Sequence, residues 1–184
     1  MIDFVLNKGL AKLAGKFGFD MVCSLDIIEA NSSAEFRKKI SKAEGLIAIR
    51  ANEGFSKEIF ESNKVSIVVG LENAREKDSL HYRKSGLDNV LCSLANKNGI
   101  SVGFSFYEVL HAKDKGKVIG RMMQNAKLCK KYKVNVVVAS FAKDKHDMRL
   151  RKDLEAFGRL MGIDKFDNTK VFKLKENSDI KVIC

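Results

Sequence analysis

Lysine and arginine side chains are concentrated in two stretches of the sequence, where they could bind a polyanion. The first stretch is 113–131 and the second is 143–152. The segment 111–152 holds thirteen Lys or Arg and three Asp, so it carries +10 of the chain's net charge of +11. A general requirement for solubility would spread the charge along the chain. This concentration therefore predicts a surface that binds phosphate groups, as in a nucleic acid.

Residues 117–132 are predicted to form a helix whose two sides differ in chemistry. At about 100° per residue, one side is apolar and carries Val118, Met122, Ala126 and Cys129. The other side is polar and basic and carries Lys117, Arg121, Gln124, Lys127 and Lys131. No Glu or Asp is interleaved to make pairs four residues apart. We expect the apolar side to pack on a sheet and the basic side to face a partner; an ordinary solvated helix face is the alternative.

Residues that could carry catalysis are few. His81, His111 and His146 stand alone, and no pair of histidines has the spacing that places two imidazoles on one metal ion. Glycine-rich phosphate loops and nucleophile elbows are also missing from the sequence. Ser105 and Ser140 lie near the carboxyl ends of predicted strands, where a structural role is expected. We therefore predict no catalytic residue, no metal site and no cofactor bound by the protein.

The cysteines and the apolar runs indicate a reduced, membrane-free environment. Cys23, Cys92, Cys129 and Cys184 are far apart and form no paired motif, so the first three are expected to be buried as small apolar side chains. No run reaches the roughly 18 apolar residues that a membrane span needs. The first residues lack the layout of a signal peptide. The sequence thus predicts a cytoplasmic protein.

Strand-like and helix-like segments alternate along the whole chain. Strands are predicted at 2–6, 19–25, 46–51, 65–71, 100–106 and 134–140, and helices at 8–18, 32–45, 85–99, 117–132 and 152–162. The alternation indicates an α/β fold with a mainly parallel sheet and helices outside it, in one domain spanning 1–184. A closed barrel and a doubly wound open sheet both fit this pattern. A further run, 170–176, alternates apolar and basic residues and is predicted to be a half-exposed strand outside the main sheet.

Two long stretches resemble a known family. "RKSGLDNVLCSLANKNGISVGFSF" (83–106) and "IGRMMQNAKLCKKYKVNVVVASFAKDKHDMRLRKDLEAFGRLMGI" (119–163) are similar to ribonuclease P protein component 3, the archaeal counterpart of the RNase P/MRP thirty-kilodalton subunit. The similarity is strong over about 80–163 and loose over 1–79. The family often carries proline where this chain has Arg151, and this chain is short for the family.

The resemblance implies a TIM-barrel-like (β/α) fold related to the polymerase-and-histidinol-phosphatase phosphoesterases, here irregular or incomplete. Those enzymes begin with a histidine pair after the first strand, whereas this chain has Asp3-Phe4-Val5. The family's role implies a non-catalytic subunit of ribonuclease P, in which the RNA subunit with its Mg²⁺ removes the 5′ leader of precursor tRNA. The implied partners are the RNase P RNA, RNase P protein component 2 and the other RNase P protein subunits, with precursor tRNA as the substrate of the complex.

The candidate RNA contacts are Arg83, Lys84, Lys117, Arg121, Gln124, Asn125, Lys127, Lys131, Lys143, Lys145, Arg149, Arg151 and Lys152. Arg121 is the first choice for a phosphate contact, because a guanidinium can bind two phosphate oxygens. Asn125 could equally hydrogen-bond within the protein. Two other hypotheses remain: a barrel phosphoesterase acting on a phosphorylated small molecule, and a scaffold whose basic surface meets an acidic protein.

Overall fold

The computed structural model describes residues 1–73, 78 and 83–174. Its strands are β1 (Ile2–Val5), β2 (Met21–Ser24), β3 (Ile27–Ile28), β4 (Ala48–Arg50), β5 (Ile67–Val69), β6 (Ser101–Ser105) and β7 (Val136–Ala139). β1 and β2 form one sheet, and β3 to β7 form a second sheet in chain order. Each pair of neighbouring strands is parallel. The parallel α/β architecture predicted from the sequence is confirmed.

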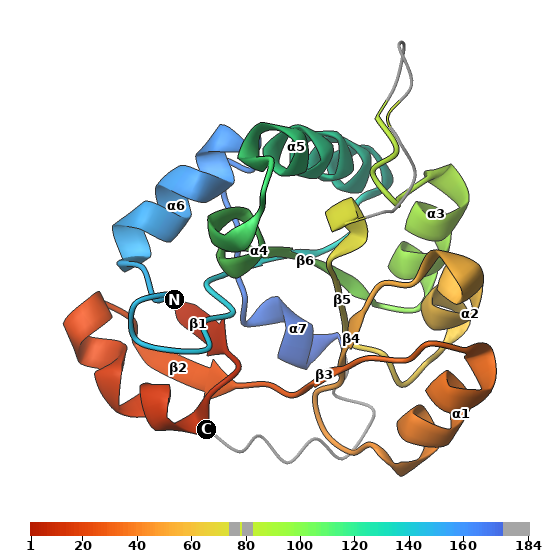
Figure 1. The fold of residues 1–184 in the computed structure, drawn as a ribbon, viewed down its shortest axis with the longest axis horizontal. Coiled ribbons are helices and arrows are strands. Elements are labelled where there is room, and N and C mark those ends of the chain that lie inside the picture. Colours follow the sequence, from red (N-terminus) through yellow and green to blue (C-terminus); the bar gives the residue numbers. More distant parts are fainter. Residues whose placement is uncertain (74–77, 79–82, 175–184) are drawn as a thin grey trace.

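The two sheets together close an irregular barrel with helices around it (Figure 1). On one side, β2 and β3 are consecutive parts of one extended segment, pairing first with β1 and then with β4. On the other side, the Phe141 amide donates to the Phe4 carbonyl and the Leu6 amide donates to the Ala142 carbonyl, both at 2.8 Å. The barrel alternative is therefore confirmed over the open sheet.

Side chains bridge the seam between β1 and β7 where backbone pairing is incomplete. Asp3 accepts hydrogen bonds from the Ser140 amide at 2.7 Å and from its hydroxyl at 2.6 Å. Asn168 donates to the carbonyls of Ile2 and Val138, both at 2.8 Å, and accepts from the Val138 amide at 3.1 Å. Its amide group thus replaces the backbone of a missing neighbouring strand. The role of Ser140 is structural, as expected.

The strands separate an apolar core inside the barrel from the apolar clusters between the strands and the surrounding helices, as their period-2 alternation requires. Inside the barrel lie Phe4, Cys23, Leu25, Ala48, Ile67, Val69, Val137, Ala139, Phe141 and Val171. The alternate residues, such as Ile49, Val68 and Val138, pack outward against the helices. Gly103 of β6 faces the interior, where a Cβ would lie 2.6 Å from Cγ1 of Val69. A glycine at this position makes room for the bulky side chains of β5.

The larger helices are the 3-10 helix η1 (Lys8–Phe17) and the α-helices α1 (Ser33–Lys42), α3 (Asn89–Lys97), α5 (Lys115–Tyr132) and α6 (Arg151–Leu160). All five were predicted, and each is followed by a residue in the left-handed conformation: Gly18, Gly45, Gly99, Lys133 and Gly162. The shorter η2 (Glu53–Phe55), α2 (Ser56–Glu61), η3 (Leu71–Asn73) and α4 (Phe106–His111) were not predicted. In the described segments, no helix is long and apolar enough to cross a membrane.

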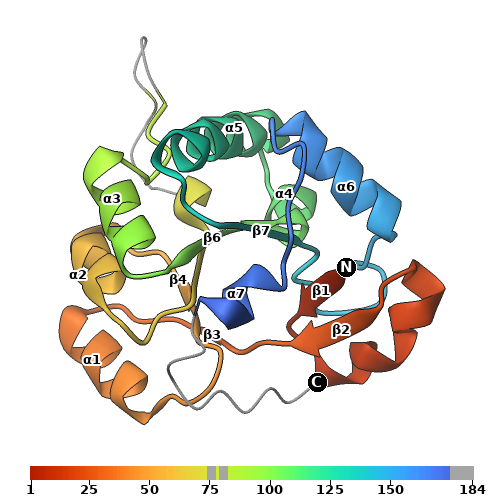
Figure 2. The same ribbon diagram turned by 180° about the vertical axis from the view of Figure 1, so that it is seen from behind.

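The predicted strand at 170–176 is wrong. Lys170–Lys173 forms a single helical turn, α7, and 175–176 lie outside the described residues. Val171 is fully buried in the barrel interior, and the ring of Phe172 lies 6.1 Å from that of Phe4. α7 therefore covers the amino-terminal end of the barrel, as seen in Figure 2. Covering this end with two adjacent apolar residues requires a turn, because a strand would point them to opposite sides.

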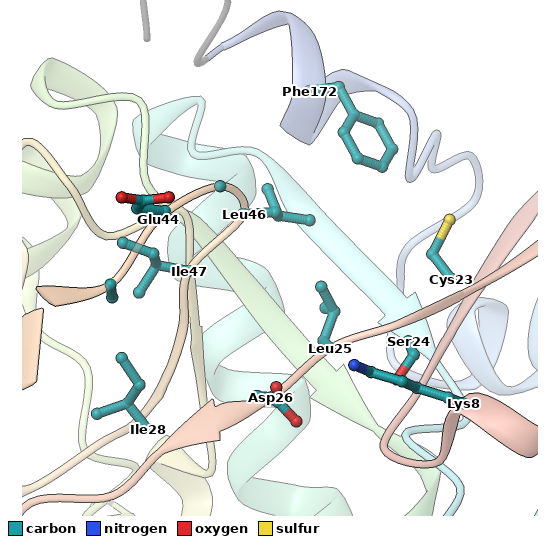
Figure 3. A pocket seen from close by; sticks show the side chains of 12 residues that line it. Lys8, Cys23, Ser24, Leu25, Asp26, Ile28, Glu44, Leu46, Ile47 and Phe172 are labelled. Carbon is teal, nitrogen blue, oxygen red and sulfur yellow. The ribbon is translucent and has the colours of Figure 1, made fainter. Parts of the chain in front are cut away.

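The two sheets meet where β2 runs into β3, and strand pairing is not continuous there. A cavity of about 340 Å³ lies there, between the segment Cys23–Ile28 and the connection from α1 to β4. Leu25, Leu46 and Phe172 line it, with Lys8 and Glu44 at its edges (Figure 3). Most residues that line the cavity are apolar. We therefore interpret the cavity as a packing gap at the irregular junction of the two sheets.

Candidate nucleic-acid interface

Arg121 is an internal residue, so its predicted contact with phosphate is wrong. Its side chain is 2% exposed. Nε donates to Oδ1 of Asp78 at 2.9 Å, Nη1 donates to the Glu72 carbonyl at 2.9 Å, and Nη2 lies 2.7 Å from Oδ1 of Asp78. The bond from Arg121 holds the pKa of Asp78 below its usual value. The guanidinium therefore binds the chain's own carboxylate and carbonyl instead of phosphate oxygens.

Asn125 is also internal, which overturns its place among the RNA contacts. Its side chain is fully buried, and Nδ2 donates to the Ser85 carbonyl at 2.9 Å. Gln124, one residue earlier, is half-buried and donates from Nε2 to the Arg83 carbonyl at 2.9 Å and to Oγ of Ser85 at 3.1 Å. Both amides hold the segment 83–85 against α5. Asn125 therefore forms a hydrogen bond within the protein, which was the alternative stated for it.

Arg83 itself lies over α5 at Gly120. A Cβ on Gly120 would lie 2.8 Å from Nε and Cζ of Arg83. Arg83 remains exposed and Lys84 partly exposed, with the Lys84 amide bonded to Asp78 at 2.9 Å. The segment 83–85 thus covers α5 between Gly120 and Asn125. Arg83 and Lys84 keep positive charge near the surface of this region, together with the exposed Lys115 and the half-buried Lys117 at the start of α5.

The carboxyl-terminal half of α5 leaves its basic residues accessible. Lys127 and Lys131 are exposed, as are the neighbouring Lys130 and Lys133, while Lys117 near the start of the helix is half-buried. Nζ of Lys131 lies 5.3 Å from the centre of the Tyr132 ring. Met122, Ala126 and Cys129 are buried on the opposite side, as the helical pattern predicted. Lys117, Lys127 and Lys131 remain predicted RNA contacts.

The second basic stretch packs its cations on aromatic rings of α4, at the carboxyl ends of β6 and β7. Nζ of Lys143 lies 4.7 Å from the centre of the Tyr107 ring, and Cζ of Arg149 lies 4.9 Å from the centre of the Phe106 ring. Arg149 also donates from Nη1 to the carbonyls of His146 and Met148, both at 2.7 Å. These contacts hold two cations at defined positions, which reduces the side-chain entropy lost when a phosphate binds.

Asp147 holds the loop 143–149 in place through hydrogen bonds. It is buried, and Oδ1 lies 2.9 Å from Nε2 of His111. Oδ2 accepts from the amides of Lys143 and Asp144, both at 3.2 Å. Burial alone would raise the pKa of Asp147, but these bonds hold it below its usual value. Sequence reasoning missed both this pair and the aromatic rings, because His111 and Asp147 are 36 positions apart.

The remaining predicted contacts lie along the same loop and the start of α6. Lys145, Arg151 and Lys152 are exposed. Arg151 forms an ion pair with Glu155 one turn later, with Nε and Oε1 2.9 Å apart. Its charge is therefore partly balanced by the helix itself, whereas Lys145 and Lys152 have no carboxylate partner within the described part of the chain.

A cluster of charged side chains occupies the carboxyl ends of β4 to β6, where barrel enzymes place their chemistry. Arg50 donates to Glu29 and to Glu108, both at 2.8 Å, and Asn73 donates to the second oxygen of Glu108 at 2.8 Å. Over 1–73, 78 and 83–174, no three His, Cys, Asp or Glu side chains are grouped to hold a metal ion. These contacts tie β4, η3 and α4 together, so they stabilise the barrel end.

Glu72 lies buried beside this cluster. Burial raises its pKa to about 8, and the charge of Glu108 raises it further against the opposing charges of Arg50 and Arg121. One of its oxygens, Oε1, has no hydrogen-bond partner among the described atoms. A neutral carboxyl group explains how this side chain is accommodated without an ion pair.

Comparison with known proteins identifies what the chain resembles. Residues 23–176 match the family model of RNase P subunit p30, which extends the similarity well toward the amino terminus. Ribonuclease P protein component 3 of Methanococcus maripaludis strain S2 is 29% identical over 136 residues, and that of Methanosarcina mazei is 26% identical over 155 residues. These alignments cover 71% and 80% of this chain but only 56% and 60% of the relatives. This chain thus spans little more than half of their length.

A solved structure has the same fold. A chain in the cryo-EM structure of archaeal ribonuclease P with mature tRNA superposes with a TM-score of 0.65 at 21% sequence identity. The superposition covers 95% of this chain and 77% of that chain. This agreement confirms the irregular TIM-barrel-like architecture.

Proposed function

The chain belongs to the RNase P subunit p30 family, and we propose that it is a protein subunit of ribonuclease P. In this role it supports the catalytic RNA in removing the 5′ leader from precursor tRNA. The observation that carries the proposal is the family match over 23–176. The polypeptide binds no cofactor of its own in this proposal, and the Mg²⁺ ions belong to the RNA subunit. The cytoplasmic location expected from the sequence is part of the same proposal.

The exposed lysines and the partly exposed Arg149 supply a physical mechanism for such support. Lys127 and Lys131 on α5, with Lys143, Lys145 and Arg149 on the loop, neutralise phosphates that would otherwise repel one another as RNA helices pack together. A protein that supplies this positive charge lowers the Mg²⁺ concentration at which the RNA folds. The cation–aromatic contacts of Lys143 and Arg149 hold part of this charge in position before RNA binds.

The proposed partners follow from the same family membership. They are the RNase P RNA, RNase P protein component 2 and the other RNase P protein subunits, with precursor tRNA as the substrate of the complex. Support comes from the relatives, which carry the name ribonuclease P protein component 3.

Reconstitution tests the proposal directly. The RNA subunit is combined with protein component 2, with and without this chain, and cleavage of precursor tRNA is followed as the Mg²⁺ concentration is lowered. We expect this chain to shift the Mg²⁺ requirement downward. Equal cleavage with and without the chain at every Mg²⁺ concentration would remove the proposed function. Phosphatase activity of the chain alone on small phosphate esters would instead favour the phosphoesterase hypothesis.

A further inference from the structure

A second group of lysines lies at the opposite end of the barrel from the loop 143–149. Five of them line a pocket of about 420 Å³, namely Lys130, Lys133, Lys165, Lys170 and Lys173. They come from three segments: the end of α5, the connection after α6, and α7. All five are exposed. Only the tertiary structure brings them together, at the amino-terminal end of the barrel that α7 covers (Figure 2).

The charge of this pocket is poorly balanced. Asp167 is the single acid among its lining residues. It accepts hydrogen bonds from the amide of Thr169 at 3.0 Å and from its hydroxyl at 2.6 Å, and the Thr169 bonds and the charges of Lys170 and Lys173 lower its pKa. Within the described part of the chain, none of the five ammonium groups has an ion-pair partner. The lining therefore carries a net +4, more than one phosphate group can neutralise.

The backbone conformation of Lys133 is a second, independent observation that favours a ligand-binding role for this charge. It caps α5 in the left-handed conformation, with φ 56° and ψ 32°, where glycine is the usual residue. Six glycines occupy such positions elsewhere in the described chain, and the exceptions among described residues are Lys133 and Phe141. A side chain at this position costs conformational energy, so a glycine would serve the helix end better. The lysine contributes charge to the pocket instead.

We propose that this lysine pocket is a second phosphate-binding site, which holds a backbone segment of RNA distinct from the one bound at the loop 143–149. The inference rests on the proposed function, because it takes the same class of ligand. The two sites lie beyond opposite ends of β7 (Val136–Ala139), and this strand alone spans about 13 Å. Phosphates bound at the two ends therefore belong to different parts of the RNA, and the protein would bridge them. Lysine suits this task because it binds phosphate as a mobile point charge.

Binding of a short labelled RNA duplex to the full chain, measured by fluorescence anisotropy across a salt series, tests the site. The pocket variant carries Lys133→Gly, Lys170→Ala and Lys173→Ala. We expect its affinity to fall at least about tenfold and the slope of log affinity against log salt to fall by about 2. A control variant with the same charge change carries Lys12→Ala, Lys38→Ala and Lys42→Ala, three exposed lysines outside the pocket. We expect a smaller loss there.

The single variant Lys133→Gly separates binding from folding. We expect weaker RNA binding together with a melting temperature equal to or above that of the wild type. A lower melting temperature would assign Lys133 a structural role and overturn the inference. So would wild-type affinity in the pocket variant, or an equal loss in the control.

The outcomes also distinguish this inference from the proposed function. If Lys143→Ala with Lys145→Ala weakens binding and the pocket variant does not, the second site is wrong and the proposed function stands. If the wild-type chain binds no RNA and does not stimulate cleavage, both fail.

Discussion

The two halves of α5 carry similar basic residues and use them in opposite ways. In the first half, Arg121 is turned inward and binds Asp78 and the Glu72 carbonyl. In the second half, Lys127 and Lys131 remain exposed to solvent. The difference arises because the segment around 83–85 covers α5 as far as Gln124 and Asn125 and leaves Lys127 and Lys131 uncovered. A positive charge on this helix is therefore structural where the chain covers it and available to a ligand where it does not.

The largest effect on stability is expected for substitution of Arg121, whose side chain points into the protein. Arg121→Ala leaves a cavity, frees the Glu72 carbonyl and removes the anchor of Asp78, so we expect the free energy of unfolding to fall by about 2 to 4 kcal/mol. Urea unfolding measures this loss. Lys127→Ala on the same helix is the matched control and should change the stability by less than about 0.5 kcal/mol. Equal stability of the two variants would contradict the division of α5.

The buried Glu72 allows the comparison between buried and exposed charges to be tested through the pH dependence of stability. Its pKa of about 8 in the folded protein lies above the ordinary value of 4.5, so the folded state retains a proton that the unfolded state loses in this window. Its contribution to stability is complete below pH 4.5 and is lost as the pH rises toward 8. Asp3, raised to about 6 by burial, acts in the same direction at lower pH.

Glu72→Gln should remove most of this dependence, because the amide is neutral at every pH. We expect the variant to be more stable than the wild type at pH 8, by about 2 kcal/mol, and to show a smaller difference at pH 5. Thermal or urea unfolding at the two pH values measures the effect. Parallel stability curves for variant and wild type would show that Glu72 is not protonated in the folded state.

The smallest effect is expected for substitution of the exposed Lys127 and Lys131, and it concerns RNA binding. Lys127→Ala combined with Lys131→Ala should weaken RNA binding about threefold to tenfold at moderate salt and lower the salt slope by about 1 to 2, because each lost phosphate contact releases fewer counterions. The melting temperature should stay unchanged. Anisotropy titrations against the Lys38→Ala, Lys42→Ala pair provide the control. Unaltered binding would leave the loop 143–149 as the main RNA contact on this side of the barrel.

Much of the fold was predictable because it depends on local patterns. The strands predicted at 65–71 and 134–140 contain runs rich in β-branched residues, which are typical of buried parallel strands, and β5 and β7 are found there. The helical spacing of Met122, Ala126 and Cys129 identified the buried side of α5. By contrast, α4 and α7 were missed: each is a short helix whose place depends on the barrel end it covers rather than on its own periodicity.

The sequence by itself determined the alternation of strands and helices, the concentration of charge in 111–152 and the family. Those properties are carried by neighbouring residues or by their order. Only the tertiary structure decided that Arg121 and Asn125 point inward, that His111 meets Asp147, and that lysines from three segments share one pocket. A helical pattern gives the angle of a side chain around its own axis. Whether that direction meets water or protein depends on segments about 40 positions away, here around Asp78 and Ser85.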